Sequence, residues 1–280
     1  LLKQILLDGG WRSMSSEKNN IFSKFKNLPI DSIPKTILVA ITLCLFCSMI
    51  VSLAAVKLKS IQQENQVRDK QKNILQVAGL YSEGINIEEA FGSFEPRIVD
   101  IESGLFTDKF NPKTFNDLKA SSDPLLSVAL KDDPASIGRR SNYLTVYLLK
   151  NNDGTIDKLI LPIHGYGLWS TLYGFVALEE DTNEIFGLQF YKHAETPGLG
   201  AEVDNPKWKA QWKGKKIYKD NKVNLAVIKG KVEAGDSEST YKIDGLSGAT
   251  ITSRGVTNMV AYWFGESGYS SLLRELDYES

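Results

Sequence analysis

Residues 36–56 place the tightest constraint on how this chain can fold, because no charged side chain occurs between Thr36 and Val56. About 20 apolar residues in a helix are enough to cross a hydrocarbon core of about 30 Å. The segment is longer than the apolar core of a typical cleaved signal peptide, although the small residues at Ser52–Ala55 would suit a cleavage site. We therefore predict an uncleaved, single-pass transmembrane helix at residues 36–56.

The residues before this helix, 1–35, are predicted to form an N-terminal tail. Residues 1–13 precede the first methionine, Met14, and we interpret them as upstream or vector-derived residues that take no part in the fold. The polar, mixed-charge stretch Ser15–Lys35 is predicted to be a loose cytoplasmic tail. Basic residues flank the apolar segment on both sides, so the charge pattern alone does not fix the orientation of the helix.

Composition excludes several classes of site. The net charge of -1 argues against nucleic acid as a partner. Both cysteines, Cys44 and Cys47, lie inside the apolar segment, where small apolar filler is their expected role. The rest of the chain therefore has no disulfide framework, thiolate metal site or cysteine nucleophile, and a total of two histidines argues against a histidine-rich metal centre.

Residues 57–140 are predicted to be a helical and irregular segment that wraps on the domain. Lys57–Ala78 is polar with sparse apolar points, which predicts a helix that continues from the membrane and ends at Gly79. Glu83–Pro134 contains four prolines and several aspartates. We expect short helices and loops there, without an independent core.

Residues 141–280 are predicted to form the domain core. Two hairpins are expected, one pairing residues 143–149 with 158–163 and the other pairing 170–178 with 184–193. A shorter strand is expected at residues 225–229, and helices are expected at 206–212, 253–263 and 270–276. Strands followed by helices predict an α+β fold with an antiparallel sheet flanked by helices.

The stretch Asp244–Thr252 combines the residue types that anion sites use. Gly245 and Gly248 let the backbone bend and approach a ligand closely. Hydroxyl groups are crowded into the same loop, at Ser247, Thr250, Thr252 and Ser253. The helix that follows is expected to begin near Ser253, so its first N–H groups and its dipole would favour a phosphate. The alternative is a glycine turn followed by a helix that Ser253 caps.

Two further stretches are suited to hold a flat ring. Leu161–Ser170 is a glycine-spaced loop in which Tyr166 and Trp169 can cover a ring face; ordinary hairpin packing is the alternative. His193–Gly200 closes a strand with a turn whose hydroxyl and exposed N–H groups can bind carbonyls or a polyol chain; a type II turn with exposed polar residues is the alternative. His164 and His193 are interpreted as hydrogen-bonded loop histidines, and no catalytic residue is assigned.

The three stretches together resemble a known family. Residues 244–250 match the motif D-G-x-[ST]-G-A-T, which is similar to the flavinylation motif of the FMN-binding domain family. In that family the final threonine carries FMN as a phosphodiester, made from FAD by a flavin transferase, so the resemblance implies Thr250 as the acceptor. L-P-x-H-G-x-G-L-W at 161–169, E-T-P-G-L-G at 195–200 and Glu95–Asp100 resemble the C-type subunit of the Na⁺-translocating NADH:quinone oxidoreductases. This resemblance runs from residue 34 to residue 276.

The resemblance implies a covalently flavinylated subunit that relays electrons. It implies that electrons come from NADH through other subunits and a membrane iron centre, and that they pass through this FMN to the flavins of the B-type subunit and finally to ubiquinone. It implies partners of the A, B, D, E and F type, a bacterial inner-membrane location with a periplasmic domain, and no independent activity. The expected cofactor-binding residues, besides the FMN acceptor Thr250, are Ser247, Gly248, Ala249, Thr252, Leu168, Trp169, Glu195, Thr196, Leu199 and Gly200.

Three alternatives stay open. The G-type subunit of the Rnf-type electron-transport complex shares the anchor, E-T-P-G-L-G and S-G-A-T, but the stretch at 161–169 favours the sodium pump. A membrane-anchored, flavin-binding sensor domain would use the same motif without a redox complex. A hydrolase that uses Ser247 is disfavoured, because Gly245–Ala249 ends in alanine where the nucleophile motif has glycine, and because the expected sheet is antiparallel.

Overall fold

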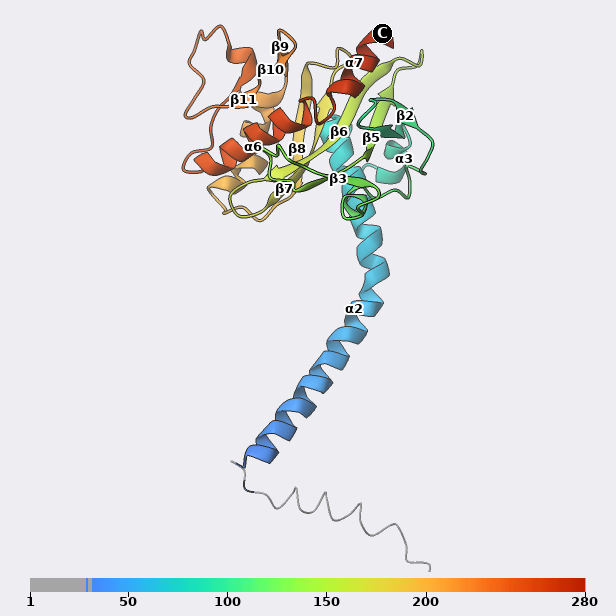
Figure 1. The fold of residues 1–280 in the computed structure, drawn as a ribbon, viewed down its shortest axis with the longest axis vertical. Helices are drawn as coiled ribbons and strands as arrows, with labels where there is room; N and C mark the ends of the chain where they lie inside the picture. Colours follow the sequence, from blue (N-terminus) through green and yellow to red (C-terminus); the bar gives the residue numbers. More distant parts are fainter. Residues whose placement is uncertain (1–28, 30–31, 280) are drawn as a thin grey trace, which may run out of the picture. The chain divides into compact units, whose positions relative to one another are not determined.

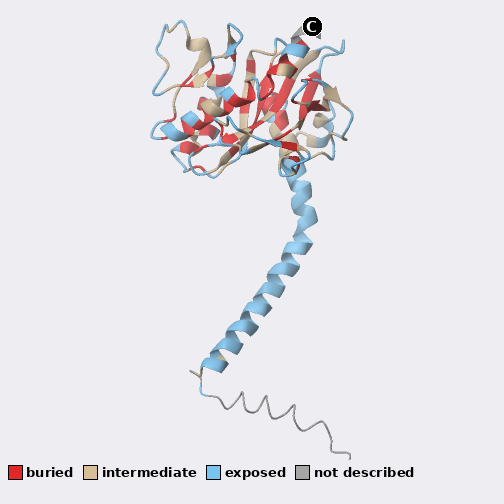
Figure 2. Ribbon diagram, viewed as in Figure 1, coloured by how far each residue is buried: buried red, intermediate tan, exposed pale blue. Residues whose placement is uncertain are grey.

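A computed structural model describes Pro29 and residues 32–279, and the chain divides into two units, residues 1–64 and 65–280 (Figure 1). Helix α2, Ile33–Val77, supplies the described secondary structure of the first unit and continues into the second. Its apolar stretch is long enough to cross a membrane, and other described residues bury none of it (Figure 2). Predictions for the tail, including residues 1–13 and most of Ser15–Lys35, concern residues outside the described part of the chain.

The second unit is built on a six-stranded antiparallel sheet. Its order is β2-β1-β5-β6-β7-β8. The strands are β1 Phe94–Asp100, β2 Phe106–Thr107, β5 Tyr143–Lys150, β6 Ile156–Tyr166, β7 Thr171–Leu178 and β8 Ile185–Lys192. Both predicted hairpins are confirmed, as β5 with β6 and β7 with β8.

Side chains on the two faces of the sheet belong to separate apolar clusters, because successive residues of a strand point to opposite faces. In β6, Leu159 and Leu161 join the cluster formed with α6, Thr250–Trp263, and α7, Ser270–Glu279. Ile160, between them, joins the cluster on the other face, formed with the C-terminal end of α2. The predicted α+β architecture is confirmed, with buried residues concentrated in the sheet and the helices that cover it (Figure 2).

The last turns of α2 are part of the domain core. Ile74 and Leu75 are fully buried, and the Asn73 Oδ1 accepts a hydrogen bond from Gln189 on β8 at 3.1 Å. The predicted stop is confirmed: Gly79 has φ 74°, and the N–H of the next residue returns to the carbonyl of Leu75 at 2.9 Å.

Residues 83–134 contain the short helices α3, Ile87–Phe91, and α4, Asp117–Ala120, and strand β3, Ser127–Ala129, which pairs with β4, Arg139–Ser141. The expectation that this region supplies only short helices and loops is wrong at β1, whose seven residues all pair with β5, from Tyr143 to Leu149. A proline inside a strand is tolerated where its missing N–H faces no partner. On the edge of β1 that faces away from β5, strand β2 pairs only with Ile98 and Val99. No described strand therefore lies beside Pro96 on that edge. The division at residue 141 stays a prediction.

The segment between β8 and α6 consists of short elements. These are a 3₁₀ turn at Gly200–Asp204, α5 Pro206–Lys209, a 3₁₀ turn at Ala210–Trp212, β9 Tyr218–Lys219, β10 Lys222–Val223, β11 Ala226–Val227, a 3₁₀ turn at Ser239–Tyr241 and β12 Lys242–Ile243. The strand expected at 225–229 is the two-residue β11, which runs parallel to β12. The helix expected at 206–212 is α5 followed by a 3₁₀ turn.

Candidate functional site

The start of α6 differs from the sequence prediction. The helix begins at Thr250, so the expectation of a start near Ser253, with Ser253 as the cap, is wrong. The Ser253 hydroxyl is buried and accepts a hydrogen bond from the N–H of Leu246 at 3.0 Å, which fixes the loop that leads into the helix. Ser253 lies one turn into the helix and therefore stabilises the preceding loop instead of marking the start of the helix.

The first turn of α6 leaves its amides open. Ala249 precedes the helix and offers no capping side chain. Among the described residues, the N–H groups of Thr250, Ile251 and Thr252 have no hydrogen-bond partner. Thr250 is exposed, and Gly248 adopts φ 72°, which favours glycine. An exposed hydroxyl, free amides and the positive end of a 14-residue helix together form a site suited to a phosphate ester.

The loop at the end of β6 presents an apolar surface. Trp169 is 66% exposed and Leu168 is 38% exposed, although apolar side chains of this size are usually buried. The Tyr166 hydroxyl donates a hydrogen bond to the carbonyl of Trp169 at 3.4 Å. The loop therefore holds exposed apolar side chains in a defined backbone conformation, as a flat ring requires.

The stretch after β8 is a type II turn. Gly198 follows Pro197 with φ 74°, and the N–H of Leu199 donates to the carbonyl of Thr196 at 3.1 Å. Leu199 is 43% exposed. A Cβ added to Gly248 would lie 2.8 Å from its Cδ2 atom, so the turn packs directly against the loop before Thr250.

Glu195 connects these elements. Its Oε1 accepts hydrogen bonds from the N–H groups of Leu168 at 3.1 Å, Trp169 at 3.0 Å and Ser170 at 3.2 Å. Its Oε2 accepts the hydroxyl of Thr252 at 2.7 Å. Burial opposes ionisation, yet the hydrogen bonds from Thr252 and the loop amides outweigh it, so the pKa of Glu195 lies below its ordinary value.

The predicted site residues are brought together in different states of exposure. Ser247, Gly248, Thr250, Leu168, Trp169, Thr196 and Leu199 are exposed, whereas Ala249, Thr252, Glu195 and Gly200 are buried. The Thr252 hydroxyl is committed to Glu195, and Gly200 leaves room for both: a Cβ there would lie 2.6 Å from the carboxylate and 2.7 Å from the hydroxyl. The inward role of Glu195 was not expected, although glycines near it in the sequence were a signal of close packing.

Both histidines make contacts with neighbouring side chains of the fold. The ring of His164 stacks on Tyr173 with centroids 5.6 Å apart and packs against Trp263 at 5.0 Å. Burial lowers the pKa of His164 to about 4, which keeps it neutral at physiological pH. The Nε2 of His193 lies 2.8 Å from Oδ2 of Asp204. Ser247 has no hydrogen bond to a histidine among the described residues, so the nucleophile–base pair of a serine hydrolase is not present there.

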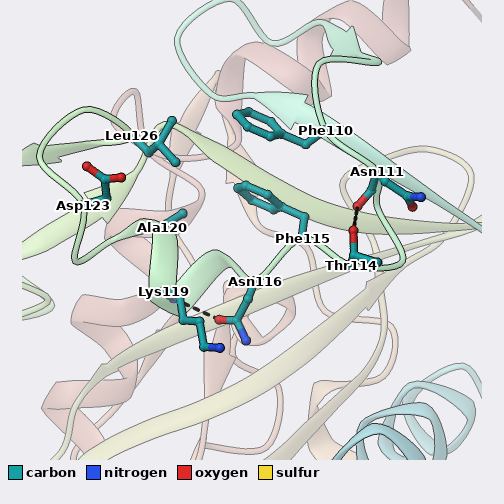
Figure 3. Close-up of a pocket in the computed structure, with 9 residues that line it drawn as sticks. All are labelled: Phe110, Asn111, Thr114, Phe115, Asn116, Lys119, Ala120, Asp123 and Leu126. Carbon is teal, nitrogen blue, oxygen red and sulfur yellow. Dashed lines mark hydrogen bonds between the residues drawn. The ribbon is translucent and has the colours of Figure 1, made fainter.

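A hollow of about 440 Å³ lies elsewhere, between residues 110 and 126 (Figure 3). The rings of Phe110 and Phe115 form part of its wall, with centroids 4.8 Å apart. None of the predicted cofactor residues lines it. The exposed surface around Thr250 combines open helix amides, which suit a phosphate, with exposed apolar side chains at Leu168, Trp169 and Leu199, which suit a flat ring.

Comparison with known proteins agrees with this fit. Residues 167–265 match the FMN-binding domain family, a range that contains the loop, the turn and α6. The chain is 50% identical over 254 residues to the C-type subunit of the Na(+)-translocating NADH-quinone reductase of Pseudomonas aeruginosa, covering 88% of this chain and 97% of that protein. It is 45% identical over 253 residues to the same subunit of Yersinia pestis, covering 88% of this chain and 94% of that protein.

Solved structures give the same result. The crystal structure of Shewanella oneidensis NqrC matches with a TM-score of 0.70 and 34% identity, covering 75% of this chain and 98% of that one. The structure of the corresponding reductase subunit from Parabacteroides distasonis matches with a TM-score of 0.61 and 31% identity, covering 77% and 96%. These relatives support the sodium-pump reading over the Rnf-type and sensor alternatives. This chain belongs to the family of C-type subunits of the Na⁺-translocating NADH-quinone reductases.

Proposed function

We propose that this chain is the flavin-carrying electron-transfer subunit of a sodium-pumping NADH:quinone oxidoreductase, with FMN attached covalently to Thr250. The observation that carries the proposal is the exposed hydroxyl of Thr250 at the first position of an uncapped helix. Membership of the C-type subunit family and the match to the FMN-binding domain support it. The chain has no activity of its own in this proposal and works with subunits of the A, B, D, E and F type.

Attachment requires a flavin transferase that uses FAD. The Thr250 oxygen forms a bond to the phosphorus of the FMN half, and the bond between the two phosphates of FAD breaks. AMP leaves, and the hydroxyl proton is released. The free N–H groups of the first turn of α6 and the helix dipole favour the negative charge of the resulting phosphodiester.

The protein's contribution to electron transfer is position. Bound FMN supplies the redox chemistry, and the link through phosphate leaves its ring unmodified. The exposed side chains of Leu168, Trp169 and Leu199 offer an apolar surface for that ring beside Thr250. Because the predicted cofactor residues form an open surface instead of a deep cavity, a second redox centre on a partner subunit can approach the ring closely.

The apolar part of α2 supports a membrane anchor, and we propose a single-pass topology in the bacterial inner membrane with the domain in the periplasm. Loss of free FMN would be costly there, and a covalent link prevents it. Trypsin added to spheroplasts should digest the domain, whereas inverted vesicles should protect it. Protection in spheroplasts would place the domain in the cytoplasm instead.

The attachment is tested on a denaturing gel. The wild-type chain, coexpressed with a flavin transferase, should give a fluorescent band that survives boiling in detergent, and the Thr250→Ala variant should give none. Ser247→Ala is the matched control, because Ser247 is an exposed hydroxyl in the same loop. Mass spectrometry of the peptide that contains Thr250 should show the added mass of FMN less water. An unmodified peptide in fully flavinylated protein would refute the proposal.

A further inference from the structure

The carboxylate of Glu195 faces the interior of the site and not the surface on which a cofactor would lie. Glu195 is 5% exposed, and its carboxylate accepts hydrogen bonds from Leu168, Trp169, Ser170 and Thr252. Three successive amides of one loop converge on one carboxylate oxygen, and a helix hydroxyl binds the other. Charge-assisted hydrogen bonds of this kind are about twice as strong as neutral ones.

The space around the carboxylate is shaped by glycines from two elements. A Cβ on Gly167 would lie 2.7 Å from Oε1, and a Cβ on Gly200 would lie 2.6 Å from Oε2. Any side chain at either position would push the carboxylate away from its donors. The loop, the turn and the first helical turn are therefore packed around this one charged group.

The geometry of α6 links Glu195 to Thr250, the residue proposed to carry FMN. Successive residues of an α-helix are rotated by about 100°, so residues two apart point to nearly opposite sides. Thr250 is exposed and Thr252 is fully buried, as this rotation requires. The hydrogen bond from Thr252 to Glu195 thus fixes the rotation of the first turn and, with it, the direction in which the Thr250 hydroxyl points.

We propose that Glu195 is the positioning residue of the flavin site, which locks the loop of Leu168 and Trp169 to the first turn of α6. The inference rests on the proposed function, because it explains how the surface for the ring and the attachment point keep a fixed relation. Glu195 itself does not touch the flavin. Its substitution frees the ring surface from the attachment point without removing either.

The test uses the full chain, coexpressed with a flavin transferase and purified in detergent. Glu195→Ala removes every acceptor, whereas Glu195→Gln keeps one carbonyl oxygen for the loop amides and places an NH₂ group against the Thr252 hydroxyl. Thr252→Val removes only the link to α6 and serves if Glu195→Ala does not fold. Asn183→Ala is the matched control. The Asn183 Oδ1 also accepts hydrogen bonds from two backbone N–H groups, those of Ile217 at 3.0 Å and Tyr218 at 2.8 Å. Asn183 precedes β8, whereas Glu195 follows β8.

Two measurements are made. Hydrogen exchange of the amides at 168–170 should become at least about tenfold faster in Glu195→Ala, and Glu195→Gln should restore most of the protection. Time-resolved anisotropy of the covalent flavin should show a fast component that is at least about twofold larger in Glu195→Ala and in Thr252→Val, since the ring surface is no longer fixed. Asn183→Ala should leave both at wild-type values even if it lowers thermal stability.

Wild-type exchange and wild-type anisotropy in Glu195→Ala would overturn the proposal. So would Asn183→Ala reproducing both changes, because the effect would then be general destabilisation. Wild-type chain without covalent flavin would refute the proposed attachment instead, and exchange at 168–170 in that unmodified chain would still test whether Glu195 locks the loop.

Discussion

The crossing of α6 over the end of β6 allows a quantitative test of the packing. Gly255 lies in the second turn of α6, and a Cβ added there would lie 2.4 Å from the backbone oxygen of Tyr166 and 3.1 Å from the Cα of Gly167. Contacts to a real Cβ essentially never fall below 3.0 Å, so the helix and the loop must separate by about 0.6 Å to accept alanine at this position. Backbone atoms cannot rotate out of the way as a side chain can.

Two opposing effects determine how much Gly255→Ala changes the free energy of unfolding. Alanine is more favourable than glycine in a helix interior by about 1 kcal/mol. Overpacking in a close-packed interior costs about 1–3 kcal/mol, and a clash with backbone belongs at the upper end of that range. We therefore expect the free energy of unfolding to fall by about 1–2 kcal/mol.

The assay is urea unfolding of the full chain in detergent, followed by tryptophan fluorescence. Ala261→Gly is the matched control, because Ala261 is exposed on the same helix and should lose about 1 kcal/mol from propensity alone. The two variants exchange the same residues in opposite directions. Propensity by itself predicts changes of opposite sign, whereas packing predicts that both variants are destabilised. A Gly255→Ala protein more stable than wild type would refute the packing argument.

Two further predictions concern the other face of the sheet and the acid Asp117. Leu75→Ala should lower the free energy of unfolding by about 2–5 kcal/mol in the same assay, because Leu75 is fully buried against the sheet; a loss below about 1 kcal/mol would contradict the assignment of α2 to the core. Burial raises the pKa of Asp117 from 3.8 to about 6, so the folded protein binds this proton more tightly than the unfolded chain. That stabilisation is complete below the unfolded pKa and is lost as pH rises through about 6. The free energy of unfolding of wild type minus that of Asp117→Asn should therefore fall by about 3 kcal/mol or less between pH 4 and 7, and a rise would contradict it.

The strands that sequence reasoning predicted are those with clear local signals. The turn at Asn151–Gly154 separates two runs of branched and aromatic residues, and β5 and β6 flank it in the structure. Strand β1 has no such signal, because Pro96 and its charged neighbours are atypical of a strand interior. Its partner strand β5 is some 50 residues away in the sequence, since Pro96 pairs with Tyr147. Strand β1 therefore forms because of this long-range pairing and not because of a local sequence preference.

For the site, the sequence indicated which stretches would matter but not how they interact. Each stretch carried glycines and hydroxyls or exposed aromatics, and these are features that local chemistry can identify. The hydrogen bond between Thr252 and Glu195 joins positions 57 residues apart, and no local pattern predicts it. The same limit explains Ser253, whose partner is the N–H of Leu246 and not an amide of its own helix.

The burial of Ile74 and Leu75 determines where the chain can be severed without harm. A protease that cut after Ala55 would shed the domain with its hydrophobic interior complete. A cut after Lys72 would leave those two side chains on a short loose end and uncover Ile160 and Phe175 beneath them. The final turns of α2 are therefore not an exchangeable tether, and any soluble version of the protein must retain them.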